Sequence, residues 1–230
     1  EDSLAVMKTA LAFVFLLFTV ALASAQNEQA PILEKEIKYK NWTYKDSRTD
    51  ADVNLRDVIK GKKLAIVIYY APWCHNWQHD APMVESLYEK YKSAGLEIVA
   101  VSEYDLLSNT KANLDQFKIT FPAVYESQSR DDREKTTHHD YSSTTGDSRK
   151  WRSPYYVFLD PSKVDKKGDT LIKKTFIING EMIELEGEKF IRERLGLPPE
   201  LPKAVSKKDK DGVETCDPDK PSIPALKKPN

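Results

Sequence analysis

Cysteine is scarce in this chain: Cys74 and Cys216 are the only two among 230 residues. Two cysteines cannot form the set of disulfides that holds many small exported domains together, so the fold must depend on its hydrophobic core. A redox pair of the form Cys-x-x-Cys is also missing, because Trp77 takes the second cysteine's position after Cys74. The sequence therefore excludes a disulfide framework and leaves a single thiol in that motif.

Charge of one sign is not in excess. The chain has 35 Lys and Arg against 36 Asp and Glu, a formal net charge of −1. A balanced chain lacks the basic surface that attracts nucleic acids or anionic membranes. We therefore predict no nucleic-acid partner and, after signal cleavage, no membrane partner. We also expect no cofactor and no resident metal ion.

Long apolar runs are absent after the first 25 residues. The basic start Met7-Lys8, the apolar run 9–22 and the small residues Ala23-Ser24-Ala25 predict a signal peptide over 7–25. Residues 1–6 are interpreted as over-extended translation. The apolar run is shorter than the roughly 20 residues that cross a bilayer as a helix, although a retained N-terminal anchor stays an alternative. We thus expect an exported protein, periplasmic or secreted.

Composition divides the rest of the chain into an extension, a domain with an insertion, and a tail. In the polar N-terminal extension, Glu36 to Tyr44 alternates loosely and predicts an edge strand. The polar insertion has no apolar periodicity, and its pair His138-His139 is expected at the surface. The tail is rich in proline and lysine and is expected to be disordered or extended. The predicted bounds are 26–50 for the extension, 51–197 for the domain, 126–149 for the insertion and 198–230 for the tail.

Buried strands alternate with helical patterns along the predicted domain. Near-continuous apolar runs are typical of strands covered on both faces, and apolar residues three to four apart are typical of helices. This alternation favours an α/β fold, with a central mixed sheet and helices on both faces. Asn179-Gly180 is a hairpin signal after the last long strand. The predicted strands are 64–70, 96–101, 155–159 and 170–178; the predicted helices are one that follows Cys74, a short helix or turn in 52–60, and helices over 109–118 and 188–195.

The most informative stretch is Tyr70-Ala71-Pro72-Trp73-Cys74-His75-Asn76-Trp77, where a predicted strand meets a predicted helix. The dipole of a helix favours negative charge at its N-terminus, so the thiolate form is expected to be favoured there. A reactive Cys74 would attack a disulfide and form a mixed disulfide; the alternative is a remnant thiol without turnover. Trp77 heads the apolar stripe of the helix and is expected to pack in the core. A UGA codon for selenocysteine, translated as tryptophan, stays open at this position.

From about Val53 to Leu197 the chain resembles the thioredoxin superfamily, most of all the exported TlpA/ResA-type thiol-disulfide oxidoreductases and the AhpC/TSA-like group. Two stretches carry the resemblance, VNLRDVIKGKKLAIVIYYAPWC and APMVESLYEKYKSAGLEIVAVS. Pro82 matches a helix-kink proline, Phe121-Pro122 matches a Phe-Pro after the second helix, and Pro154 matches the cis-proline that faces the active site. The resemblance implies a thioredoxin-like fold and a thiol-disulfide oxidoreductase that acts in cell redox homeostasis.

The resemblance also implies roles for single residues. Cys74 would be the nucleophile, and Asp80 would be a carboxylate that handles protons at the thiol. Asp80 could equally be a first-turn residue that complements the helix dipole. Trp73, Ser153 and Pro154 would bind an extended substrate by strand addition. The expected partners are protein or small-molecule thiols and disulfides, and the oligomeric state stays open.

Two departures from the family pattern bear on the chemistry. Trp77 stands where these families place the resolving cysteine, so a monothiol form is expected. Ala71 is not the Thr or Ser with which a peroxiredoxin holds peroxide, which argues against peroxidase activity. Cys216 in the tail could act as a distant resolving thiol, since flexible linkers reach tens of Å, or it could stay unpaired.

Two other functions stay open. A non-catalytic binding module would hold a peptide or protein in the groove between Trp73 and Pro154. Metal delivery would use Cys74 with His75 or His79, which lie one helical turn apart. This ranks last, because such a pair at a helix start is more typical of a solvated surface than of a metal site.

Overall fold

The structure is a computed structural model that describes residues 28–199. Within this range, no helix has both the length and the apolar character needed to cross a membrane. The predicted signal peptide over 7–25, residues 1–6, and the tail with Cys216 lie outside the described residues.

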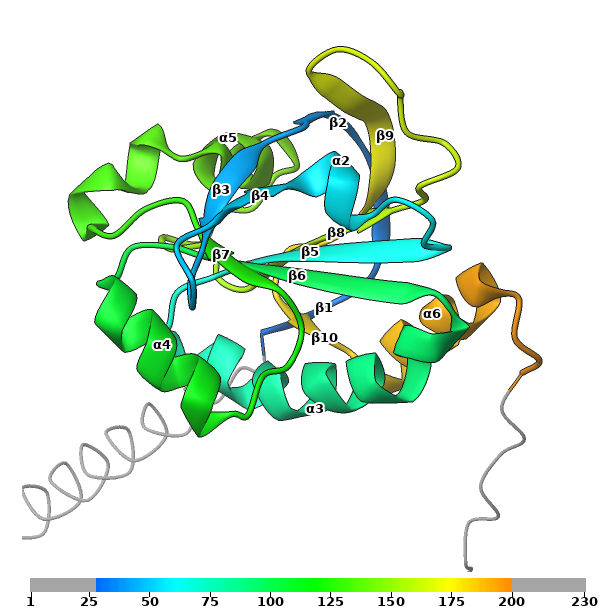
Figure 1. The fold of residues 1–230 in the computed structure, drawn as a ribbon, viewed down its shortest axis with the longest axis horizontal. Helices are drawn as coiled ribbons and strands as arrows, with labels where there is room; N and C mark the ends of the chain where they lie inside the picture. Colours follow the sequence, from blue (N-terminus) through cyan, green and yellow to red (C-terminus); the bar gives the residue numbers. More distant parts are fainter. Residues whose placement is uncertain (1–27, 200–230) are drawn as a thin grey trace, which may run out of the picture. The chain divides into compact units, whose positions relative to one another are not determined.

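A mixed eight-stranded sheet forms the centre of the described fold (Figure 1). The pairs β5–β6 and β6–β7 are parallel, whereas β8, β9 and β2 continue the sheet in antiparallel pairs. The central mixed sheet predicted from the sequence is therefore confirmed. The strand order is β2 (Leu33–Lys40), β9 (Thr170–Ile178), β8 (Tyr155–Leu159), β5 (Leu64–Tyr70), β6 (Leu96–Ser102), β7 (Ala123–Tyr125), β3 (Thr43–Asp46) and β4 (Asp52–Asn54).

Strand β5 lies between two hydrophobic cores. All seven of its residues are buried, as an unbroken apolar run in a sheet covered on both faces requires. Successive side chains of a strand point to opposite faces, so Ile66, Ile68 and Tyr70 join one core, and Val67 and Tyr69 join the other. The site that follows β5 is thus anchored on a strand held from both sides.

Helices cover both faces of the sheet, as predicted. In Figure 1, α3, α4 and α6 lie on one face and α2 and α5 on the other. The first core takes side chains from α3, α4 and α6, and the second takes them from α2 and α5. The bounds are α2 Leu55–Val58, α3 His75–Tyr91, α4 Leu107–Gln116, α5 Thr137–Thr144 and α6 Glu184–Leu195, with short 3-10 helices at η1 Lys92–Ala94 and η2 Arg130–Lys135.

The hairpin predicted at Asn179-Gly180 is wrong. Strand β10 (Glu181–Met182) does not return along β9; it pairs in parallel with β1 (Gln29–Ala30). Gly180 makes room for this N-terminal segment, because a Cβ at this position would lie 2.3 Å from the carbonyl oxygen of Glu28. The pairing with a distant segment, which no local pattern encodes, decides the course of the chain after the turn.

The insertion also differs from its prediction. It contains η2 and α5, and its His138 is fully buried rather than at the surface. The side chain of Thr136 caps α5 by accepting a hydrogen bond from the backbone N–H of His139. The His138 ring stacks against Tyr69 and Tyr104. Aromatic neighbours from the sheet supply the apolar surroundings that the insertion lacks in its own sequence.

Candidate functional site

Cys74 lies at the junction of β5 and α3, as the sequence predicts. It is the N-cap residue of α3, with extended backbone angles, and its side chain is half-buried. The backbone N–H of Cys74 donates to the carbonyl of Ala71 at 2.9 Å, which closes the turn. The thiol donates a hydrogen bond to the carbonyl oxygen of Ser153, with 3.3 Å between sulfur and oxygen. The sulfur therefore lies at a helix start and directly beside the segment that leads into β8.

The Ser153-Pro154 peptide bond is cis and lies next to the cysteine turn. The Ser153 hydroxyl oxygen accepts from the backbone N–H of Ala71 at 2.9 Å, and the Ser153 carbonyl accepts from Cys74. Both residues of the cis pair are buried. Two elements far apart in the sequence are thus joined at the thiol by hydrogen bonds of one residue.

Trp77 fills the space beneath the turn. Its indole is fully buried, with its ring centroid 4.4 Å from that of Tyr70. The indole N–H donates to the side-chain oxygen of Asn113 at 2.9 Å, and the Asn113 amide in turn donates to the carbonyl of Pro72 at 3.1 Å. Trp77 and Asn113 together fix the turn on which Cys74 stands.

Asp80 is a buried carboxylate in α3. One of its oxygens accepts hydrogen bonds from the hydroxyl of Tyr156 and, at 2.9 Å, from the backbone N–H of Met182. Burial raises the pKa of Asp80 to about 6, although both hydrogen bonds act in the opposite direction. Among the described residues, Asp80 has no hydrogen bond to Cys74. The carboxylate therefore titrates near neutral pH.

A set of possible metal ligands lies next to Asp80. One ligand atom each from His79, Asp80 and Glu181 lies within 4.8 Å of the other two. The His79 ring nitrogen is 2.8 Å from a carboxylate oxygen of Glu181, so a hydrogen-bonded pair already accounts for these two groups. His75 is exposed and does not join the set. These three side chains could hold a divalent ion, but Cys74 is not among them.

An aromatic surface with arginines borders the thiol. The ring of Trp73 meets that of Trp151 edge-on at 5.1 Å. The guanidinium of Arg130 lies 4.5 Å from the Trp73 ring centroid, and that of Arg133 lies 5.5 Å from the Trp151 centroid. Both indoles are half-buried. This surface offers flat apolar contacts and positive charge to a ligand at Cys74.

His138 makes buried hydrogen bonds on the same side of the site. Its two ring nitrogens bond to the hydroxyl of Tyr104 at 3.0 Å and to the carbonyl of Arg152 at 3.1 Å. Tyr104 and Arg152 both have positive φ, 63° and 52°, a conformation that is uncommon for residues other than glycine. Burial lowers the pKa of His138 to about 3, so the ring is neutral. A neutral imidazole that can both donate and accept thus bonds to the side chain of Tyr104 and to the backbone of Arg152.

Sequence reasoning named Cys74, Trp77, Ser153 and Pro154, and the structure brings them together. It missed His138 and Arg149, whose polar segment has no periodic pattern. The one available signal was that Arg149 lies only five residues before Pro154. Missed as well were Glu28, Asn113, Trp151, Tyr156 and Glu181, which reach the site from other elements.

Comparison with known proteins identifies the family. The model of the AhpC/TSA family matches residues 34–183. ResA, a thiol-disulfide oxidoreductase of Oceanobacillus iheyensis, is 36% identical over 78 residues, which are 32% of this chain and 38% of ResA. Protein disulfide-isomerase A4 of Mus musculus is 35% identical over 75 residues, which are 32% of this chain and 11% of that protein. The matches thus span well under half the length of either relative.

Solved structures show the fold. A thiol:disulfide interchange protein of the thioredoxin family from Chlorobium tepidum matches with a TM-score of 0.51 and 16% identity, covering 70% of this chain and 98% of its own. A thiol:disulfide interchange protein from Bacteroides sp. matches with a TM-score of 0.50 and 17% identity, covering 76% and 94%. The fold is that of the thioredoxin superfamily, and the chain belongs to the AhpC/TSA family.

Proposed function

We propose that this chain is an exported monothiol protein that carries out thiol-disulfide exchange through Cys74. The observation that carries the proposal is the place of this thiol, half-buried at the start of α3 and hydrogen-bonded to Ser153 beside the cis Pro154. The names of the matched relatives state thiol-disulfide chemistry, which supports the same reaction here. The signal peptide predicted over 7–25 supports export.

The reaction begins when the Cys74 thiolate attacks one sulfur of a substrate disulfide. The disulfide bond breaks, its electron pair leaves with the other sulfur, and a new bond joins Cys74 to the substrate. A second thiolate then attacks the mixed disulfide and restores Cys74. No net oxidant or reductant is consumed, because a disulfide is exchanged for another disulfide.

The residues around the thiol have distinct roles in this proposal. Trp73 offers its ring to the substrate, and Ser153 with Pro154 places an extended substrate segment beside the sulfur. Asp80, with its pKa of about 6, is the carboxylate that exchanges protons near neutral pH. Ala71 stands three residues before Cys74 and offers no hydroxyl to hold a peroxide, so peroxidase chemistry is not proposed.

Release of the substrate needs a second thiol, and residue 77 cannot supply one because it is tryptophan. The indole of Trp77 is buried and hydrogen-bonded to Asn113; the codon for residue 77 distinguishes tryptophan from selenocysteine. An external thiol is the proposed resolving group. Cys216, outside the described residues, is the alternative; its attack on the Cys74 sulfur releases the substrate thiolate and leaves a Cys74–Cys216 disulfide, which an external thiol then reduces.

Trapping on Cys74 tests the proposal. The full chain with Cys216→Ser is mixed with a disulfide-bonded peptide, and intact mass is measured after acid quenching. We expect an added mass of one peptide thiol on the protein, and none when Cys74→Ser is also present. Wild-type protein that clears the adduct faster than the Cys216→Ser variant would identify the tail thiol as resolver. No adduct under any condition would end the proposal.

A binding module is the second candidate, favoured by the aromatic surface beside the thiol. Arg130 on Trp73, and Trp73 against Trp151, form a contact surface that needs no sulfur chemistry. If binding is the function, Cys74→Ser keeps the affinity for a captured partner, whereas Trp73→Ala lowers it. A partner lost in the Cys74→Ser variant would favour exchange.

A further inference from the structure

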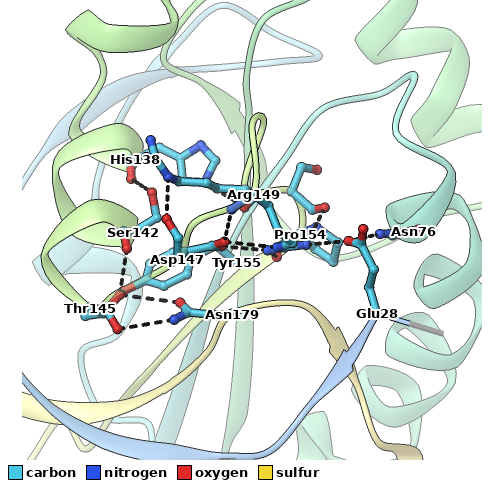
Figure 2. Close-up of polar contacts among 12 residues, drawn as sticks. Glu28, Asn76, His138, Ser142, Thr145, Asp147, Arg149, Pro154, Tyr155 and Asn179 are labelled. Carbon is cyan, nitrogen blue, oxygen red and sulfur yellow. Dashed lines mark hydrogen bonds and ion pairs between the residues drawn. The ribbon is translucent and has the colours of Figure 1, made fainter. Parts of the chain in front are cut away.

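Arg149 ends the polar insertion and uses every N–H of its guanidinium (Figure 2). Two nitrogens bind the Asp147 carboxylate, at 3.1 and 2.7 Å. The remaining N–H groups donate to the carbonyl oxygens of Ser153 at 3.0 Å and Pro154 at 2.9 Å, and to the Glu28 carboxylate at 3.0 Å. The planar fork of the side chain thus fixes both carbonyls of the cis pair in one geometry.

One of these carbonyls is shared with the thiol. The oxygen of Ser153 accepts from Arg149 at 3.0 Å and from the sulfur of Cys74 at 3.3 Å, so sulfur and guanidinium lie within about 6 Å of each other. When Cys74 loses its proton, it also loses its hydrogen bond, and the carbonyl dipole then faces a negative sulfur. A cation bound to the same oxygen offsets this repulsion, and at such separations it favours the thiolate.

The charge of Arg149 is moderated by two carboxylates that differ in exposure. The side chain of Asp147 is 2% exposed, whereas that of Glu28 is 44% exposed. Burial lowers the pKa of Arg149, but the hydrogen bonds and charges of Asp147 and Glu28 more than compensate, so the net pKa is raised. The guanidinium is therefore always charged. Glu28 is the partner that can be removed with the least disturbance.

Glu28 also reaches the helix that carries the thiol. Its carboxylate accepts from the side-chain amide of Asn76, two residues after Cys74, and Figure 2 shows it between Asn76 and Arg149. The backbone of Glu28 is fixed by a hydrogen bond to Glu181 at 3.0 Å. Glu28 lies outside residues 34–183, which match the family model. Glu28 thus joins Asn76 of α3 to Arg149 from a segment outside the family match.

Other titratable groups lie on the elements that pack around the thiol. None of them, among the described residues, shares a hydrogen-bond acceptor with Cys74 as Arg149 does. These groups are His75, His79 and Asp80 on α3, Glu181 on β10, Arg130 above Trp73, and Arg152 before Ser153.

We propose that Arg149 is a positioning residue of the thiol site, which promotes ionisation of Cys74 through the shared Ser153 carbonyl, and that Glu28 opposes it as a removable counter-charge. The inference rests on Cys74 being the reactive thiol of the proposed function. Loss of the contact to Glu28 then makes the thiol more reactive.

The test is the pH profile of Cys74 alkylation by iodoacetamide, measured in the full chain with Cys216→Ser so that one thiol remains. Arg149→Gln moves the midpoint of the profile to higher pH and slows alkylation at pH 7 by about tenfold, the effect of one pH unit. Glu28→Gln moves it to lower pH and speeds alkylation by about twofold, since the group is partly exposed and screened. Arg194→Gln, at an exposed arginine of α6 that lies over the rings of Phe176 and Phe190, is the matched control and leaves the profile unchanged.

Opposite signs are the decisive result, because general damage to the site would shift both variants in one direction. Equal shifts, or none, would overturn the proposal. Melting temperatures monitor folding; if Arg149→Gln does not fold, Glu28→Gln decides, and an unchanged or slower rate refutes the idea. Alkylation needs no disulfide substrate, so shifted profiles without peptide adducts would end only the exchange function. A Cys74 that never reacts with iodoacetamide would end both.

Discussion

Two segments that meet at Cys74 are built in different ways. The turn segment, residues 70–77, rests on the buried strand β5 and is locked by the indole of Trp77. The insertion segment, residues 126–154, is held in shape by hydrogen bonds of His138 and Arg149 to its own carbonyls at Arg152, Ser153 and Pro154. The turn segment depends mainly on burial of apolar area, whereas the insertion segment depends on directional polar contacts as well, so a thiol between them is sensitive to both core packing and charge.

Removing the anchor of the turn segment has the largest expected effect. Trp77→Ala deletes a fully buried indole and its hydrogen bond to Asn113, and the free energy of unfolding falls by about 3–5 kcal/mol. The matched variant Trp151→Ala, at a half-buried ring of the insertion segment, costs about 1 kcal/mol. Urea denaturation measures both. Equal losses would show that the two segments do not differ as described.

The stability of the protein at acidic pH tests the insertion segment through His138. His138 has a pKa of about 3 when folded, against about 6.5 when unfolded, so the unfolded chain binds the extra proton first. Stability is complete above pH 6.5 and falls by about 1.4 kcal/mol per pH unit below it, until the folded value is reached. His138→Gln flattens this fall, whereas His75→Gln, at an exposed position, keeps it. Denaturation midpoints between pH 4 and 8 check the slope, and an unchanged slope in His138→Gln contradicts the assignment.

Asp80, the buried carboxyl of α3, changes stability with pH in the opposite direction. Burial raises the pKa of Asp80 from 3.8 to about 6, so its protonated form is favoured by folding, and this contribution is lost as the pH rises through about 6. Asp80→Asn should raise stability by about 2 kcal/mol at pH 7 and leave it unchanged at pH 3.5. Glu186→Gln, at an exposed residue, serves as control. A gain that does not depend on pH would point to packing instead of titration.

The smallest effect on stability is expected at Glu103, which directly follows β6. Glu103 is fully buried, and burial together with the nearby Glu126 raises its pKa well above the usual value. Folding therefore favours the protonated form of this carboxyl, and its contribution to stability is lost as the pH rises. Glu103→Gln keeps the shape and should stabilise the protein more at pH 9 than at lower pH, by about 1 kcal/mol. Exposed Glu134→Gln is the control, and a loss of stability at pH 9 would contradict the prediction.

The sheet could be predicted where the apolar pattern is strong. The bounds of β5 and β8 coincide with the apolar runs 64–70 and 155–159, because strands covered on both faces must be apolar throughout. The bounds of β9 coincide with 170–178, where polar residues alternate with apolar ones and Lys173 and Lys174 are exposed. Loose alternation in the extension predicted the edge strand β2. The α5 helix was not predicted, because its residues 137–144 are mostly polar and their burial comes from aromatic side chains of other elements.

Only part of the candidate site could be predicted from the sequence as well. The motif around Cys74 and the proline at 154 are visible in the sequence, and the structure joins them by two hydrogen bonds of Ser153. Arg149 and Glu28 could not be found in this way, because a charged residue in a polar segment has no periodic signature. Their 121-residue separation shows that only the folded chain pairs them.

The sequence by itself determined which residue carries the thiol, that its usual partner is replaced by tryptophan, and which apolar runs form the sheet. These features are local, since burial demands apolar residues and a strand-to-helix turn has a short signature. The tertiary structure alone decided that His138 is buried, that β10 joins β1, and that Arg149 and Glu28 share the surroundings of Cys74. Those outcomes depend on which distant polar groups find partners when the segments pack together, and no stretch of chain encodes that by its own composition.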